Sequence, residues 1–279
     1  MSIADKRRAF RKLHESGCFV IPNPWNAGSA RYLQGLGFRA LATTSSGYAH
    51  SQGHADGDVT LGMALTHCRE ITEAADVPVN ADFEGGFAHD PTGVADNVRR
   101  CIETGVAGLS IEDFTGDEAN PLYDFDLALA RVRAARATID KAGGDVVFTA
   151  RSEGFIHGRT DMDETLRRLK AFADAGADCL YAPGIRSREQ IETVVKAVAP
   201  KPVNLLMGWA GGLTVDEIAA MGVRRISVGG TLARVAMHAF IKSAKEIAEH
   251  GKFDSFAGIM PNAELNKFFS SAGKQNKSS

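Results

Sequence analysis

Acidic side chains and one arginine stand at the ends of three short apolar runs in this chain. The first run ends in Asp82-Phe83-Glu84, the second in Glu112-Asp113 and the third in Arg151-Ser152-Glu153. Each run is typical of a buried strand, and a stretch with helical periodicity follows each one. In a parallel α/β fold all strand ends point the same way, so we expect these charged groups to meet at one rim.

Carboxylates that converge repel one another unless a cation lies between them. Carboxylate oxygens, partly acting through water, are the ligands that Mg²⁺ prefers. We therefore interpret Asp82, Glu84 and Glu112 as candidate ligands of a divalent metal. A single acidic residue at a strand end is as often a helix cap or the partner of a surface lysine, but three clusters on neighbouring strands favour the metal site.

Arg151 ends an apolar run, and a buried arginine requires an anion. The sequence leaves two kinds of partner open, which are a substrate carboxylate and an internal ion pair with Glu153 or Glu112. No lysine or cysteine falls at a predicted strand end, since Lys201 precedes its strand. A Schiff-base mechanism would therefore lack its nucleophile.

Two turns that contain glycine follow predicted strands. Ser45-Ser46-Gly47-Tyr48 offers hydroxyl groups and backbone N–H groups, and Gly229-Gly230 precedes the last long helix. Backbone N–H groups in such turns bind anions, and the turn after the last strand is the usual phosphate position in barrels. Glycines after strands are also common turn formers, so both interpretations stay open.

Short apolar runs and longer amphipathic stretches alternate along most of the chain, and these elements must position the charged groups. The predicted strands are 18–23, 40–45, 77–82, 108–113, 146–151, 179–183, 202–207 and 225–229. The predicted helices are 26–36, 61–75, 92–104, 125–142, 162–175, 188–198, 214–221 and 232–249. The repeat length of about 30 residues matches a βα unit. Eight such units predict a (β/α)8 TIM barrel, with a doubly wound sheet as the alternative.

Composition limits the classes of function. With 279 residues, a formal net charge of −2 and no long basic run, the chain is a poor candidate for binding nucleic acid. No apolar stretch is long enough to cross a membrane, and residues 1–14 lack the apolar core of a signal peptide. Four widely spaced cysteines without a C-x-x-C pair indicate reduced thiols in a cytoplasmic protein.

The end of the chain differs from the rest. We predict a barrel over residues 1–250 and a C-terminal helical extension and tail over 251–279. Large apolar residues between 253 and 269 are compatible with a short helix that packs on a neighbouring subunit.

The ordered set of motifs resembles the isocitrate lyase / phosphoenolpyruvate mutase superfamily, from about Phe19 to Gly230. The segment that begins Pro22-Asn23-Pro24-Trp25 resembles the turn after the first strand, and Thr44-Ser45-Ser46-Gly47-Tyr48 resembles the segment that binds the substrate carboxylate and keto oxygen. Further resemblances involve Asp58 as a metal-shell aspartate, Asp82-Phe83-Glu84 as the Asp-x-Asp metal motif, Glu112 as the strand-four glutamate, Thr149-Ala150-Arg151-Ser152-Glu153 as the Ala-Arg-Thr-Asp segment, and Asn204 as the strand-seven asparagine.

The resemblance implies a Mg²⁺ (or Mn²⁺) enzyme that acts on a small α-keto acid, or on a 2-hydroxy acid cleaved to one, through a metal-stabilised enolate. In that reading Asp82, Glu84 and Glu112 hold the metal, and Arg151, Glu112, Asn120 and Asp58 are catalytic. Ser45, Ser46, Gly47, Tyr48, Trp25 and Asn204 would bind substrate. Members are usually tetramers that exchange the last helix between neighbours, so a homo-oligomer (dimer or tetramer) is expected.

Departures from the family pattern narrow the activity. The lyases carry a Lys-Lys-Cys-Gly-His loop after the strand-four glutamate, whereas residues 114–121 here read Phe-Thr-Gly-Asp-Glu-Ala-Asn-Pro. Cleavage of isocitrate or methylisocitrate is therefore not expected. Asn120 falls near an asparagine of the phosphonopyruvate mutases, but Ala182-Pro183-Gly184 replaces their phosphonate-binding histidine.

The leading hypothesis is a lyase similar to oxaloacetate decarboxylase, which forms pyruvate from oxaloacetate. The alternatives are a C–P bond enzyme similar to phosphonopyruvate mutase or hydrolase, and a keto-acid-binding member of the family without catalysis. A phosphosugar aldolase that uses Gly229-Gly230 is a further rival, and the missing strand-end lysine counts against it.

Overall fold

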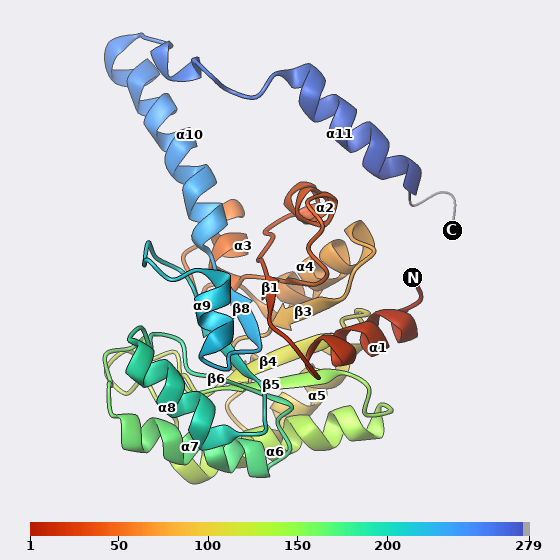
Figure 1. Ribbon diagram of the computed structural model, residues 1–279, viewed down its shortest axis with the longest axis vertical. Helices are drawn as coiled ribbons and strands as arrows, with labels where there is room; N and C mark the ends of the chain where they lie inside the picture. Colours follow the sequence, from red (N-terminus) through yellow and green to blue (C-terminus); the bar gives the residue numbers. More distant parts are fainter. Residues whose placement is uncertain (276–279) are drawn as a thin grey trace.

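Eight short parallel strands form one sheet that curls into a nearly closed barrel (Figure 1). The computed structural model describes the backbone of residues 1–275 and the side chains of residues 1–270. The strands are β1 (Phe19–Ile21), β2 (Leu41–Ala42), β3 (Val79–Asp82), β4 (Gly108–Glu112), β5 (Val147–Arg151), β6 (Cys179–Tyr181), β7 (Val203–Leu206) and β8 (Arg225–Ser227).

The strand order establishes the barrel. Hydrogen-bonded neighbours run β1-β8-β7-β6-β5-β4-β3-β2, and every pair is parallel. At the remaining seam, the Ala42 N–H donates to the Pro22 carbonyl at 3.1 Å. Pairing of the first strand with the last confirms the predicted (β/α)8 barrel, because a doubly wound sheet leaves its edge strands open.

Helices alternate with the strands and cover the outside of the barrel (Figure 1). They are α2 (Ala27–Gly35), α4 (Leu61–Ala74), α5 (Pro91–Ile102), α6 (Phe125–Lys141), α7 (Met162–Asp174), α8 (Arg188–Val198), α9 (Val215–Ala220) and α10 (Thr231–His250). All eight were predicted. Asp161 caps α7, since its side chain accepts from the Glu164 N–H at 3.1 Å.

Two helices lie where the sequence analysis placed none, and both matter for the site. The helix α1 (Ile3–Leu13) is capped by Ser2, and α3 (Ser45–Ser51) is capped by Thr44. The segment from Ser45 was interpreted as a turn ahead of a helix, whereas it forms the first turn of α3 itself. A helix of seven residues gives too short an apolar pattern for periodicity to reveal it.

The helix α1 closes the barrel at the starts of the strands. Its Phe10 is fully buried and packs in one cluster with Phe19 of β1 and Val147 of β5, each the first residue of its strand. His14, which follows the helix, packs edge-on against Phe10 and Phe19, with ring centroids 4.7 and 5.2 Å away. The N-terminal residues therefore form the floor of the barrel interior.

The C-terminal segment projects away from the barrel. In Figure 1, α10 rises from the mouth, and α11 (Asn262–Gln275) runs back across an open space toward α2. There Phe268 packs against Tyr32, with ring centroids 4.5 Å apart. Several large apolar side chains of the projecting part are exposed, and they include Phe240, Ile241, Phe253, Phe256, Ile259 and Met260.

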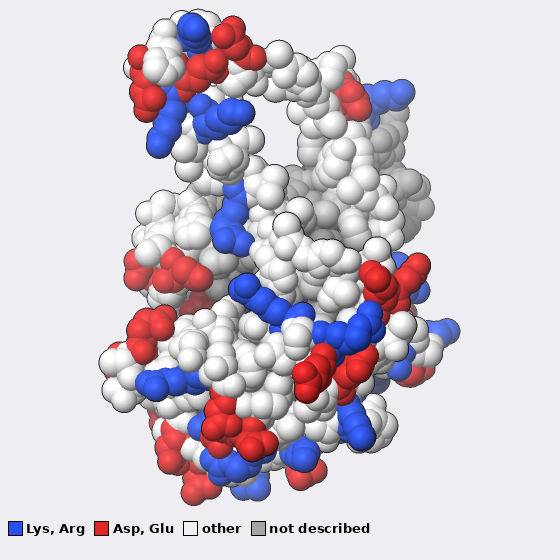
Figure 2. Space-filling model, turned by 60° about the vertical axis from the view of Figure 1, so that its left-hand side comes forward, with Lys and Arg blue, Asp and Glu red and all other residues white. Residues whose placement is uncertain are grey.

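Charge is mixed on the surface. On the face drawn in Figure 2, acidic and basic side chains are interspersed over the barrel, without a large area of one sign. In the part of the chain that the structure describes, no helix is both long and apolar enough to cross a bilayer.

His14, at the floor of the barrel, makes the stability of the folded state depend on pH. Its Nδ1–H donates to the Phe10 carbonyl at 2.8 Å, which leaves Nε2 as an acceptor 3.4 Å from Nη1 of Arg225. Burial, reinforced by the charge of Arg225, lowers the pKa of His14 to about 3. The folded protein thus holds a neutral ring, whereas an unfolded chain protonates His14 at its ordinary pKa of 6.5.

We expect His14 to make the folded state less stable as the pH falls. Below about pH 6.5 His14 binds a proton in the unfolded state but not in the folded state. The free energy of unfolding therefore declines between pH 7 and about pH 4. Urea unfolding of the wild type and of His14→Gln at pH 7, 6, 5 and 4.5 measures this. The two proteins should diverge, with the wild type losing more stability. Parallel curves would contradict the prediction, because other titrating groups are common to both proteins.

Candidate active site

Arg151 is the centre of the charged group at the mouth of the barrel. Its Nη1 lies 2.7 Å from an oxygen of Asp82, its Nη2 lies 3.2 Å from Glu112, and its Nε lies 2.8 Å from Glu153. Glu112 and Arg151 are direct neighbours in the ladder between β4 and β5. The convergence expected from the strand ends therefore occurs, and the internal ion pair that the sequence left open is formed.

A polar cavity of about 170 Å³, which we call the inner cavity, opens beside Asp82 and Arg151. It runs from the turn at Gly229-Gly230 down to Arg225 at the start of β8. Of the predicted site residues, it is lined by Ser45, Ser46, Asp82, Arg151 and Asn204. The charged cluster therefore has open space next to it, as a binding site requires.

Asp82 connects the cluster to α3. Its Oδ2 accepts hydrogen bonds from the backbone N–H and the hydroxyl of Ser45, both at 3.1 Å. Its own backbone N–H donates to Thr43 Oγ1 at 2.8 Å. The first residue of α3 is thus fixed to the strand end that carries the acidic motif.

A second hollow of about 490 Å³ adjoins the cluster, and we call it the acidic hollow. Its acidic lining residues are Asp56, Asp58, Glu84, Glu112 and Glu118, and Asp56 also lines the inner cavity. Asp58 was expected from the sequence, whereas Asp56, which lies two residues before it in a loop, was not. Only its D-x-D spacing relative to Asp58 could have suggested it.

Negative charge is in excess around these two cavities. Burial raises the pKa of Glu84 to about 8, and the charges of Asp82 and Asp56 act in the same direction. Burial also raises the pKa of Glu112, and the neighbouring carboxylates reinforce this while Arg151 opposes it. One arginine does not neutralise so many carboxylates, and a bound cation would relieve the imbalance.

The donor set matches a hard divalent cation in type and charge. Carboxylate oxygens suit Mg²⁺, which keeps several waters and uses one or two carboxylates directly. Among the side chains of residues 1–270, however, no three of Asp, Glu, His or Cys are close enough together to hold an ion. Asp82 and Glu112 point to Arg151, whereas Glu84 lines the acidic hollow. Their joint binding of a metal thus remains a prediction, and water would complete the coordination.

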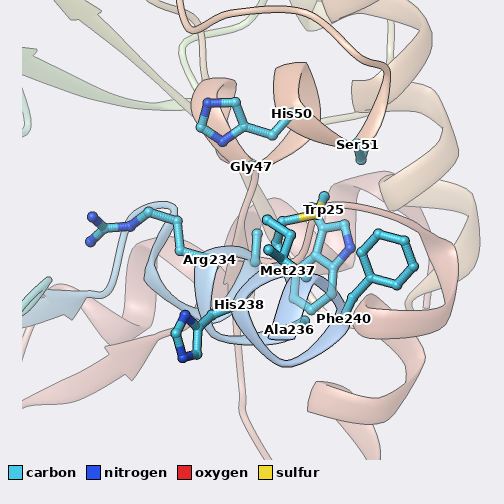
Figure 3. A pocket seen from close by; sticks show the side chains of 11 residues that line it. Trp25, Gly47, His50, Ser51, Arg234, Ala236, Met237, His238 and Phe240 are labelled. Atoms are coloured by element: carbon cyan, nitrogen blue, oxygen red, sulfur yellow. The ribbon is translucent and has the colours of Figure 1, made fainter. Parts of the chain in front are cut away.

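Other predicted residues lie elsewhere. Trp25 and Gly47 line a separate, largely apolar hollow of about 560 Å³ between α3 and α10, together with Met237 and Phe240 (Figure 3). Gly47 allows close contact there, because a Cβ at this position would lie 3.0 Å from that of Ala233. The two residues therefore support the wall of the site and do not line the inner cavity.

Tyr48 and Asn120 also differ from expectation. Tyr48 is buried and stacks on His67, with ring centroids 4.0 Å apart, because the turn of α3 directs it to the protein interior. Asn120 is exposed and donates to Asp117 within its own loop at 3.3 Å. In this structure neither residue lines the inner cavity or the acidic hollow.

The turn at Gly229-Gly230 borders the inner cavity but is closely packed. A Cβ on Gly230 would collide with Oγ of Ser46. Asn23 accepts hydrogen bonds from the backbone N–H groups of Val228 and Gly229 at 3.0 and 2.9 Å. The Gly229 N–H is therefore already used, which weakens the interpretation of this turn as a phosphate site.

Known proteins resemble this chain over most of its length. Residues 10–248 match the family described as phosphoenolpyruvate phosphomutase. A solved structure from Burkholderia cenocepacia J2315, provisionally described as a lyase/mutase, is 45% identical, has a TM-score of 0.92 and covers 96% of each chain. The 2-methylisocitrate lyase of Escherichia coli (strain K12) is 30% identical over 257 residues, which are 86% of this chain and 85% of the enzyme. The oxaloacetate decarboxylase of Paraburkholderia xenovorans (strain LB400) is 29% identical over 245 residues, which are 84% and 79%.

The loop that begins at Glu84 is fastened by Arg131 of α6. Glu84 itself has a φ of 46°, a left-handed conformation that is unfavourable for a residue with a side chain. Arg131 is 1% exposed and donates to the backbone carbonyls of Gly85, Ala88 and His89. Arg131 thus holds the residues after Glu84 through their carbonyl groups. It forms no ion pair with any carboxylate in the described part of the chain.

Replacement of Arg131 should loosen the loop that begins at Glu84. We expect Arg131→Met to lower the free energy of unfolding by about 1–3 kcal/mol, because carbonyl groups lose their buried donors. It should also make residues 84–89 exchange amide hydrogens faster. Arg133→Met is the matched control, since Arg133 is exposed on the same helix and should change stability by less than about 0.5 kcal/mol. If the two substitutions lower the free energy of unfolding equally in denaturant, Arg131 does not hold the loop in the way proposed.

Proposed function

The chain belongs to the phosphoenolpyruvate mutase family, and on that premise we propose that it is a metal-dependent lyase that decarboxylates a small α-keto diacid such as oxaloacetate. The observation that supports this most directly is Arg151, a cation held among carboxylates at the edge of a polar cavity. A 29% identical relative is an oxaloacetate decarboxylase. Mg²⁺ or Mn²⁺ is the proposed ion.

Arg151 is the proposed anchor for the substrate carboxylate. Glu153 contacts both its Nε at 2.8 Å and its Nη2 at 3.2 Å, which fixes the plane of the guanidinium group. Asp82 holds Nη1 on the side of the inner cavity. Because Glu153 takes Nε and Nη2, the Nη1 N–H that Asp82 does not use is the donor left for a substrate carboxylate, which it would bind through a charge-assisted hydrogen bond.

The carboxylates complete the proposed chemistry. Asp82, Glu84 and Glu112 would hold the divalent cation, with Asp58 as an outer residue. When bound, such a cation polarises a keto oxygen as a Lewis acid. Ser45 keeps Asp82 in place through two hydrogen bonds, and Ser46 lines the cavity where a substrate oxygen would need a donor.

The loop after β4 supports decarboxylation over cleavage of a larger hydroxy acid. Residues 114–121 contain no cysteine, lysine or histidine that could serve as an acid or base. His157 holds the loop in place. Phe114 stacks on its ring at a centroid distance of 3.9 Å, and Glu118 pairs with the same ring at 3.1 Å. Loss of carbon dioxide needs less proton transfer than an aldol cleavage, so a site without these residues can still catalyse it.

We also propose that the protein is a cytoplasmic homo-oligomer, a dimer or tetramer. The projecting α10 and the connection between α10 and α11 expose apolar side chains such as Phe240 and Ile259, at 66% each. An exchange of α11 between subunits would cover such surface, in keeping with the extension predicted for residues 251–279.

A direct assay tests the reaction. Purified protein with Mg²⁺ should form pyruvate from oxaloacetate well above the rate of Mg²⁺ alone, and a chelator should abolish this excess. Phosphonopyruvate is the comparison substrate for C–P chemistry and should give no turnover. If the protein forms pyruvate from phosphonopyruvate and not from oxaloacetate, its reaction is C–P cleavage and the proposed decarboxylation is wrong. If it turns over neither substrate, both reactions are rejected.

Asp82→Asn should remove activity and spare the fold. The amide keeps the shape of the side chain but loses the charge needed for a metal, so we expect kcat/KM for oxaloacetate to fall by about 100-fold or more, with a melting temperature within a few degrees of the wild type. Asp145→Asn is the control, because Asp145 pairs with Arg7 at 3.0 Å and lies just before β5, at the other end of the barrel. If Asp82→Asn unfolds the protein to the same extent as it lowers activity, the cluster is a structural ion network.

A further inference from the structure

Arg225 is a buried cation without an acidic partner. It is the first residue of β8 and is 3% exposed. Its hydrogen bonds go to neutral groups, which are Asn204 Oδ1 at 2.8 Å, Thr149 Oγ1 at 3.0 Å and the neutral His14 ring at 3.4 Å. No carboxylate of the described residues forms an ion pair with it. An arginine keeps its proton in proteins, so a positive charge is buried here without compensation.

Arg225 lies at the bottom of the inner cavity, below Arg151. The guanidinium of Arg225 bonds to Thr149, which precedes Arg151 by two residues on β5 and faces the same side of the strand. Two residues along a strand span about 6.6 Å. Both arginines line one continuous cavity, in which Arg151 at the mouth is paired with carboxylates and Arg225 at the floor is not.

The inner cavity that both arginines line is polar and larger than a water site. Its walls carry Asn80, Ser110, Asn204 and Ser227, and the side-chain oxygen of Asn80 is buried without a hydrogen-bond partner. One water needs only about 10–15 Å³, whereas the cavity offers about 170 Å³. The cavity can therefore hold a small polar molecule of several atoms.

We propose that Arg225 forms a second carboxylate subsite, so that the ligand of the inner cavity is a dicarboxylate with one end at Arg151 and the other at Arg225. The inference rests on the proposed function for the identity of the reacting end, and it adds the residue that recognises the far end. A dicarboxylate neutralises the charge of Arg225. A monocarboxylate leaves it unpaired in a desolvated place, and binding sites reject ligands that leave buried polar groups unsatisfied.

Malate and lactate form a matched pair of probes. They share the 2-hydroxycarboxylate end and differ in that malate carries a second carboxylate. Calorimetry with the full-length protein and Mg²⁺ should show malate binding at least tenfold more tightly than lactate. In Arg225→Gln, this ratio should fall to about threefold or less, mainly through weaker binding of malate. Thr149→Val is the control, because it removes one neutral contact of Arg225 and keeps the charge, so most of the preference should remain.

Two outcomes would overturn the subsite. The first is a wild type without preference for malate, which means that the cavity recognises no second carboxylate, and this result stands even if Arg225→Gln does not fold. The second is an equal loss of malate and lactate binding in Arg225→Gln, which means that Arg225 only supports the barrel floor. Binding needs no turnover, so an Arg225-dependent preference without oxaloacetate decarboxylation would reject the proposed reaction and leave the subsite in place.

Discussion

The whole site depends on the attraction between one guanidinium group and the carboxylates that three neighbouring strands bring to it. Arg151 contacts Asp82, Glu112 and Glu153 within 3.2 Å, and the parallel register of β3, β4 and β5 makes this meeting unavoidable. The acidic partners outnumber the cation, and the pKa of Glu84, which burial raises to about 8, is raised further by the charges of Asp82 and Asp56. A surplus of negative charge beside a polar cavity is a natural place for a divalent cation and an anionic substrate.

The fold was predictable because apolar periodicity repeats in every βα unit. The ends of β3 and β5 fall at the predicted residues and that of β4 one residue earlier, so the meeting of Asp82, Glu112 and Arg151 was predictable. The predicted end of β2 at residue 45 was wrong, since β2 ends at Ala42 and α3 begins at Ser45. Side-chain directions outside the strands were not. Tyr48 turned inward with α3, a helix too short for its pattern to be seen, and Asn120 lies on a loop whose shape is set by local hydrogen bonds. These positions depend on tertiary packing that no spacing encodes.

Arg225 was missed for a different reason. In a barrel, chemistry is sought at the carboxyl ends of the strands, and Arg225 is at the start of its strand. Its long side chain reaches the barrel interior, where Thr149 and Asn204 receive it. The polar interior is compatible with folding because α1 closes the floor with Phe10, so that the buried arginine is separated from bulk water at the end opposite the mouth.

The seam between β1 and β2 has a mechanical consequence. These strands end the hydrogen-bonded order, whereas the other neighbours share ladders. Two bonds cross the seam, because the Ala42 N–H donates to the Pro22 carbonyl and the Asn23 side-chain amide donates to the Thr43 carbonyl at 2.9 Å. The side-chain oxygen of Asn23 also accepts from Val228 and Gly229, so this one buried amide joins three strands where no ladder forms and holds the backbone that leads to α3 and its contact with Asp82.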